Sequence, residues 1–245
     1  MNTNTANAIS EDVIELRQYT LKPGRRDELV ELFESELIAG QQAAGMRIIG
    51  QFHDLDDPDR FVWLRGFADM AARKRALSDF YGGPVWQAHR AAANDTMIDS
   101  DNVLLLRPAY PGSNFDLSNF DLSPSANAQS EGRIFATVQY FDAPISDEAL
   151  SFFALVMVAV WSRMGAPVLA SFVTEYADNN YPALPVRADE HVLLWFSRHA
   201  DEAAHRRHVE QLAQWPQVSA AWARLAPRPP EVLKLQSTPR SWLRS

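Results

Sequence analysis

Residues 80–90 hold the densest group of side chains that could do chemistry. The segment reads FYGGPVWQAHR, with Phe80, Tyr81 and Trp86 placed around a Gly-Gly-Pro break. His89 is its candidate proton carrier, because an unperturbed imidazole titrates near neutral pH. The segment suits the mouth of a ligand cleft, and it equally suits a helix-to-helix corner packed by aromatic rings.

Two strand-like segments upstream add further polar and aromatic side chains. In residues 13–20 and 60–67, alternate positions share a face, which groups Arg17 with Tyr19 and Trp63 with Arg65. Tyr19 and Trp63 are either walls of a pocket for a flat substrate or core aromatics whose polar ends are satisfied. We expect ligand contacts from Trp63, Arg65, Phe80, Tyr81 and Trp86, with His89, Tyr19, Arg17 and His53 as catalytic candidates.

Metal and nucleotide chemistry are not favoured by the sequence. His205 and His208 follow Asp201 at helical spacing, but the adjacent Arg206 and Arg207 would repel a cation, so we expect no metal. Glycine-rich phosphate loops, nucleophile elbows and dinucleotide fingerprints are missing from the sequence. We therefore expect no cofactor.

Composition narrows the class of protein. The 245 residues are 47% hydrophobic and contain no cysteine, which excludes disulfides and thiol catalysis. The net charge is -8 and basic residues are scattered, so we expect no nucleic-acid partner. The N-terminal sequence lacks a secretory signal, and the apolar run at residues 152–161 is too short to span a membrane, so we expect a cytoplasmic protein without a membrane span.

The elements that would position these residues alternate between strand and helix. Residues 13–20 read as a strand, 25–39 as an amphipathic helix, and 45–54 with 60–67 as a hairpin around a turn-forming DDPD. Helices at residues 68–80 and 85–97 and a strand at 102–107 follow. The order β-α-β-β-α-β predicts a ferredoxin-like unit.

The second half of the chain repeats landmarks of the first. Gln18-Tyr19 matches Gln139-Tyr140, Trp63 matches Trp195, and Asp69 matches Asp201, each in the same order and context. A tandem duplication explains these matches better than chance. We expect a disordered tail at 1–12, a first unit at 13–108, a linker at 109–131 and a diverged second unit at 132–245.

The segments ELRQYTLKPG, RFVWLRGF, ADMAARKRAL and DFYGGPVWQAHRAA together resemble the NIPSNAP family. That family belongs to the dimeric α/β-barrel superfamily, in which two ferredoxin-like units close their antiparallel sheets into one barrel. The resemblance implies an α+β fold in which one chain supplies both halves of the barrel. It also implies a ligand site between a sheet and its helices.

The resemblance leaves several functions open. Relatives in the superfamily include cofactor-independent monooxygenases that act on aromatic substrates, which implies a pocket for a small apolar or aromatic molecule. A non-catalytic module that binds a ligand or a protein is the alternative, and haem held by a histidine is a further one. The second half carries an apolar helix at residues 150–161, which predicts a cover from the linker, from another chain or from an apolar ligand whose cavity it walls. Cover by protein is favoured, and a homo-oligomer through this helix is one form of it.

Overall fold

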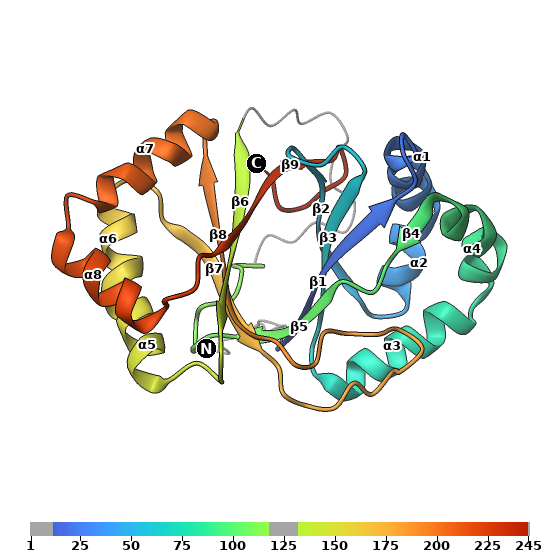
Figure 1. Cartoon of the computed structure of the whole chain (residues 1–245). Helices are drawn as coiled ribbons and strands as arrows, with labels where there is room; N and C mark the ends of the chain where they lie inside the picture. The colour runs from blue at the N-terminus through green and yellow to red at the C-terminus, as the bar shows by residue number, and fades with distance from the viewer. Residues whose placement is uncertain (1–11, 118–131, 245) are drawn as a thin grey trace, which may run out of the picture.

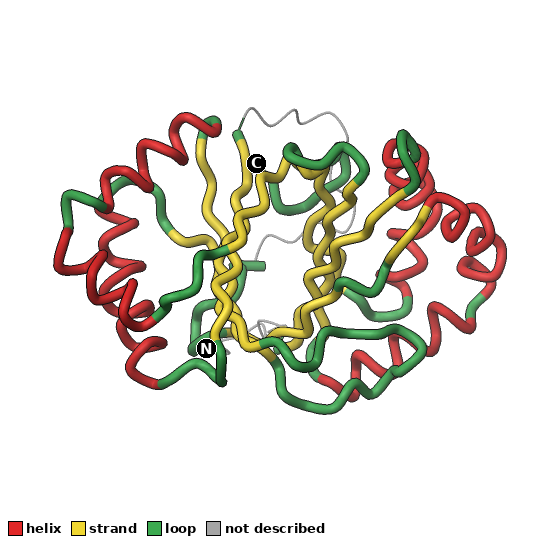
Figure 2. The backbone as a smooth tube through the Cα atoms, in the orientation of Figure 1, coloured by secondary structure: helices red, strands yellow, loops and turns green. Residues whose placement is uncertain are grey.

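The computed structural model describes residues 12–117 and 132–244, and these form a closed β-barrel flanked by two groups of helices (Figures 1 and 2). The expected tail at 1–12 and most of the expected linker therefore lie outside the described residues. The two helical groups lie on opposite sides of the barrel, one from each half of the chain.

The first unit has the predicted β-α-β-β-α-β order, with one additional short strand, β4. Its strands pair in the order β2-β3-β1-β5, and β4 pairs with the end of β1. The elements are β1 (Val13–Leu21), α1 (Arg26–Leu32), the π-helical turn η1 (Phe33–Leu37), α2 (Ile38–Ala43), β2 (Arg47–Asp54), β3 (Arg60–Phe67), α3 (Met70–Gly82), α4 (Pro84–Thr96), β4 (Met97–Asp99) and β5 (Val103–Pro108).

The second unit repeats this arrangement without a counterpart of β4. Its strands pair in the order β7-β8-β6-β9, which corresponds strand for strand to the first unit. The elements are β6 (Arg133–Phe141), α5 (Asp147–Phe152), the π-helical turn η2 (Phe153–Met157), α6 (Val158–Arg163), β7 (Val168–Thr174), β8 (His191–His199), α7 (Glu202–Leu212), α8 (Pro216–Leu225) and β9 (Glu231–Ser237).

Two antiparallel pairings between the units close the barrel. β2 pairs with β9, where Phe52 lies opposite Ser237, and β5 pairs with β7, where Leu106 lies opposite Thr174. A single four-stranded sheet with helices on one face leaves its other face in need of cover. The two sheets cover each other, which confirms the prediction of an intrachain dimeric α/β-barrel.

The barrel interior is a packed apolar core. Its layers come from alternate residues of both units, such as Leu16 beside Leu64 on the first sheet and Ala136 beside Phe196 on the second. Phe115, from the start of the expected linker, is 6% exposed and packs on Phe196, with ring centroids 5.2 Å apart. The C-terminal segment adds Leu243 to the same core. The opposite, outer face of each sheet is covered by the helices of its own unit.

The helices of the two units share an unusual feature. Each first helix contains a five-residue π turn, which begins at Phe33 in one unit and at Phe153 in the other, and each ends near a glycine with positive φ, Gly45 or Gly165. Positive φ is readily adopted only by glycine. These repeated details support placing the two units in register with each other.

The apolar helix of the second unit is covered on one side only. Phe153 and Met157 are buried against the sheet, whereas Leu155 is 77% exposed. Within the described residues, none of the helices combines the length and the hydropathy that crossing a membrane requires.

Candidate functional site

Each unit has a layer between the outer face of its sheet and its helices, and the two layers differ in what fills them. The strand pairing shows which positions correspond: Arg17 lies opposite Trp63 on the first sheet, and Thr137 lies opposite Trp195 on the second. This register corrects the sequence match of Gln18-Tyr19 with Gln139-Tyr140, which is shifted by one residue. A shift of one residue moves a side chain to the other face of a sheet.

In the first unit, a buried carboxylate organises the layer. Glu15 on β1 is fully buried and accepts hydrogen bonds of 2.7 Å from Arg17 Nη1, Arg65 Nε and Arg73 Nε. Burial alone would raise the pKa of Glu15, but the three guanidinium groups outweigh it and hold the pKa well below its usual range. Glu15 is therefore ionised at neutral pH.

The aromatic side chains of this layer pack around the charged cluster. The Arg17 guanidinium lies 5.5 Å from the Trp63 ring and also donates to the Tyr19 hydroxyl at 3.0 Å. Phe33 packs edge-on against Trp63, with ring centroids 4.8 Å apart. Only about 30 Å³ of free space is left beside Trp63, which is the volume of roughly one water molecule.

A loop from the second unit seals the edge of this layer. Residues 175–190, which connect β7 to β8, run past α3 of the first unit (Figure 1). Asn179 and Asn180 accept hydrogen bonds from Arg73 Nη1 at 3.1 and 2.8 Å, and the Tyr181 ring lies 6.1 Å from that of Tyr81. The first unit therefore has no room for a substrate in this layer.

The structure thus brings most of the predicted site residues together, but as a packed layer. Arg17, Tyr19, Trp63, Arg65 and Phe80 are buried, and Tyr81 and Trp86 are half-buried beside them. This arrangement matches the alternative in which the aromatic rings form a core.

The two predicted histidines lie apart from that layer. His89 on α4 is 3.5 Å from the Glu36 carboxylate and does not line the small cavity beside Trp63. His53 on β2 lies 4.0 Å from Asp27. Its pKa is lowered, mainly by burial and then by the charge of Arg26.

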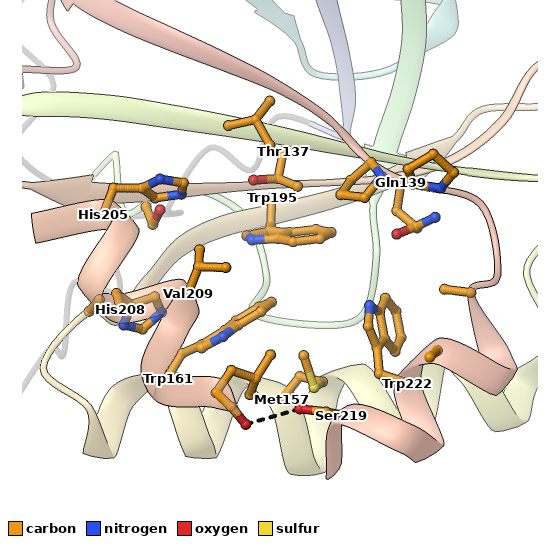
Figure 3. A pocket seen from close by; sticks show the side chains of 18 of the residues that line it. Thr137, Gln139, Met157, Trp161, Trp195, His205, His208, Val209, Ser219 and Trp222 are labelled. Atoms are coloured by element: carbon orange, nitrogen blue, oxygen red, sulfur yellow. Dashed lines mark hydrogen bonds between the residues drawn. The ribbon is translucent and has the colours of Figure 1, made fainter. Parts of the chain in front are cut away.

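The second unit contains a large cavity at the corresponding place. It has a volume of about 470 Å³ and lies between β6, β8 and the helices α6, α7 and α8 (Figure 3). Its walls are mostly apolar and include three indole rings, those of Trp161, Trp195 and Trp222. A space of this size lies within the usual range for a small-molecule site.

The cavity exists because the charged cluster of the first unit is replaced by shorter or neutral side chains. The strand register and the helix caps at Asp69 and Asp201 align the two units residue by residue. Removing three long guanidinium side chains opens the space, and removing the carboxylate removes their counter-charge. The replacements are Glu15 by Phe135, Arg17 by Thr137, Arg65 by Ser197 and Arg73 by His205.

The three indoles surround the middle of the cavity. Trp161 and Trp195 are stacked at a centroid distance of 5.2 Å and an interplanar angle of 26°. Trp222 on α8 approaches from the other side, where its ring lies 6.0 Å from that of Phe153. Figure 3 shows Trp195 above the space, with Trp161, Met157 and Trp222 below it.

Polar side chains lie at the two ends of this aromatic middle. Gln139 is at one end, with its amide held by a 2.6 Å hydrogen bond to the carbonyl oxygen of Arg228. His205 and His208 are at the other end. His205 stacks on Phe135 at 3.8 Å, and His199 lies beside both of the other imidazoles and contacts Ser197 Oγ at 3.1 Å.

Burial keeps these three imidazoles uncharged at neutral pH. Burial, followed by repulsion from the neighbouring imidazoles, lowers the pKa of His199 to about 4. Burial, followed by the charges of His208 and Lys234, lowers the pKa of His205 to about 4. Burial alone lowers the pKa of His208. The cavity is thus lined by neutral groups that can donate or accept hydrogen bonds.

Metal binding gains no support from the geometry. Within the described residues, no group of three or more histidine, aspartate or glutamate side chains is arranged to hold a metal ion. Asp201 instead caps α7, where its carboxylate accepts a 2.6 Å hydrogen bond from the Ala204 amide.

Sequence reasoning placed the candidate residues in the first unit and did not select the residues of the cavity. On β8 the sequence did contain a signal for the cavity. Once Trp63 is matched with Trp195, the residue two positions further on is Arg65 in the first unit but the much smaller Ser197 in the second. On β6, the Gln-Tyr match shifted the comparison by one position and hid the pairing of Arg17 with Thr137.

Solved structures with the same architecture cover nearly the whole chain. A candidate monooxygenase from Lactobacillus acidophilus NCFM is 15% identical, with a TM-score of 0.53, over 93% of this chain and 94% of its own. Another from Fusobacterium nucleatum subsp. nucleatum ATCC 25586 is 9% identical, with a TM-score of 0.54, over 93% of each chain. At these identities the likeness shows the fold alone.

Shorter structures match part of the chain. A NIPSNAP family protein from Agrobacterium tumefaciens str. C58 is 24% identical, with a TM-score of 0.36, over 39% of this chain and 91% of its own. No curated protein matches the chain at a significant level. The NIPSNAP family model matches residues 14–111. This match covers the first unit, which forms half of an intrachain α/β-barrel.

Proposed function

We propose that the chain binds a flat, apolar or aromatic small molecule in the cavity of its second unit. The observation that carries this proposal is the space of about 470 Å³ among Trp161, Trp195 and Trp222. A pocket with apolar walls and a few converging polar groups is typical of small-molecule sites. The first unit, whose corresponding layer is filled, acts in this proposal as the rigid partner that completes the barrel.

The lining of the cavity favours a ligand without a fixed charge. Its buried or half-buried polar groups include Thr137, Gln139, Ser197, His205 and His208, and all are neutral at neutral pH. An ionic ligand would lose its hydration without gaining a counter-ion there. Arg228 lies at the edge, with its guanidinium 5.4 Å from the Tyr140 ring.

Within this proposal, an oxygenase-type reaction that needs no cofactor is the leading enzymatic activity. Two structures of the same fold are described as candidate monooxygenases. Chemistry of this kind requires an apolar, water-poor site with a group that can move a proton. The cavity offers apolar walls and uncharged imidazoles, and both features support the proposal.

Binding of 7-methoxycoumarin, a flat neutral aromatic probe, tests the proposed site. Calorimetry should detect binding to the wild-type chain, and Ala223→Phe on α8 should weaken it at least tenfold because the ring occupies the cavity. Ala220→Phe, on the same helix but outside the cavity, is the matched control and should bind like wild type. Equal weakening by both variants, or no binding to the wild type, would contradict the proposal.

A non-catalytic role as a protein-binding module is the second candidate. Leu155, 77% exposed on the apolar helix of the second unit, favours it. In this alternative, two copies of the chain associate through the outer face of α5, η2 and α6. A solution mass above the 27.6 kDa of one chain would support association of two copies.

A further inference from the structure

His208 lies between the apolar cavity and a second space that is polar. The second space, which we name the vestibule, has a volume of about 260 Å³ and is lined by Arg198, His199, Arg207, His208 and Gln211. Arg198, Arg207 and Gln211 are exposed, so the vestibule opens to solvent. His208 lines both spaces, the apolar cavity and the solvent-open vestibule.

The ring of His208 is held in place without hydrogen bonds. The residue is 9% exposed, its ring centroid lies 6.3 Å from that of Trp161, and its Nδ1 atom is buried without a partner among the described residues. A buried polar atom of this kind is rare in native proteins and calls for an explanation. An imidazole that exchanges a proton needs a ring nitrogen that is not committed to a structural hydrogen bond.

Burial keeps His208 uncharged until an anion forms nearby, and its neighbours are imidazoles and arginines. The His199 ring lies 5.2 Å away, and His205, which faces the same cavity, is itself flanked by Glu202 and Lys234. Arg198 and Arg207 face it from the vestibule. Burial lowers its pKa, whereas a negative charge on a ligand in the cavity would raise that pKa again.

We propose that His208 accepts a proton from a ligand with a weakly acidic hydroxyl group, a phenol or an enol, and passes that proton to water in the vestibule. The O–H bond of the ligand breaks, its electron pair stays on the oxygen, and an N–H bond forms on the imidazole. The imidazolium pairs with the ligand anion, a phenolate or enolate, for as long as that anion stays in the cavity. When the anion leaves, the imidazolium loses this proton to water in the vestibule and His208 returns to its neutral form.

This inference rests on the proposed function, because it requires a ligand in the cavity. Its direction follows from the surroundings of His208. Burial disfavours an imidazolium at His208, so the proton is held only while the ligand anion is beside it. Release into the vestibule then restores the neutral cluster.

A pair of probes separates the two claims. 7-Methoxycoumarin has no acidic proton and reports on the cavity alone, whereas the absorption of 7-hydroxycoumarin reports its ionisation. In wild-type protein, bound 7-hydroxycoumarin should ionise at a pH at least about one unit lower than in His208→Gln, which is a tenfold difference in the ionisation constant. His191→Gln, a histidine of β8 outside both spaces, should match wild type.

A second measurement avoids any effect of the substitution on folding. In wild-type protein labelled with ¹⁵N-histidine, the His208 signals should move toward the protonated form with 7-hydroxycoumarin and stay neutral with 7-methoxycoumarin. Equal ionisation midpoints in wild type and His208→Gln, or unchanged His208 signals, would overturn the role of His208 while 7-methoxycoumarin still binds. Failure of 7-methoxycoumarin to bind would overturn the proposed function and this inference with it.

Discussion

Replacing Glu15 by glutamine tests whether the buried charge cluster holds the first unit closed. Glutamine keeps the shape of the side chain but removes the negative charge that Arg17, Arg65 and Arg73 share. Breaking a buried ion pair from one side costs about 3–5 kcal/mol, because the remaining charge is left without compensation. The three pairs share one carboxylate, so their effects do not simply add.

We therefore expect Glu15→Gln to lower the free energy of unfolding by at least about 3 kcal/mol. For a chain of this size, that loss corresponds to a melting temperature lower by roughly 6–12 °C. Urea unfolding measures the loss directly as a lower midpoint, with the slope unchanged if the native state keeps its compactness.

Glu28→Gln is the matched control for this experiment. Glu28 also binds an arginine, with an oxygen 2.6 Å from Arg25 Nη2, but its side chain is exposed. We expect its unfolding free energy to change by less than about 1 kcal/mol, because solvent screens exposed pairs. A Glu15→Gln variant as stable as this control would refute the argument that the cluster seals the first unit.

The remaining predictions concern the second unit. The pKa values of His199 and His205 are about 4 in the folded chain and near 6.5 when it is unfolded. Between about pH 4 and 6.5 the unfolded chain therefore binds more protons than the folded chain. The free energy of unfolding should fall as the pH drops from about 6.5 to about 4. A His199→Gln/His205→Gln double variant should flatten this dependence in urea unfolding, and an unchanged slope would contradict the assigned pKa values. If two copies associate through the apolar helix, light scattering should give a mass above the 27.6 kDa of one chain. Leu155→Asp should reduce that mass, and Ala91→Asp, at an exposed position of α4 in the first unit, should not. A wild-type mass of one chain would exclude that association.

The order of strands and helices could be predicted from the sequence because local patterns determine it. Alternation in residues 60–67 and helical spacing in residues 25–39 follow from the periods of the two structures. Closure of the barrel follows from the need of each sheet to cover its second apolar face. These arguments require no knowledge of individual side-chain contacts.

The position of the cavity could not be predicted in the same way, because it depends on register and on side-chain volume. The repeated Gln-Tyr pair led to a match shifted by one residue, which placed Tyr140 in the role of Tyr19, although Tyr140 instead donates to Glu231 at 2.8 Å. The sealing loop at 175–190 has no periodic pattern that reveals its contacts with the other unit. Long-range contacts of this kind become visible only in the folded chain.

The position of a bound aromatic molecule tests the central claim most directly. A crystal structure of the chain grown with 7-methoxycoumarin would show where the probe binds. The account predicts electron density for the probe in the second unit beside Trp195 and Trp222, with Glu15 still bound to its three arginines. Density for the probe beside Trp63 in the first unit, with the second cavity empty, would contradict it.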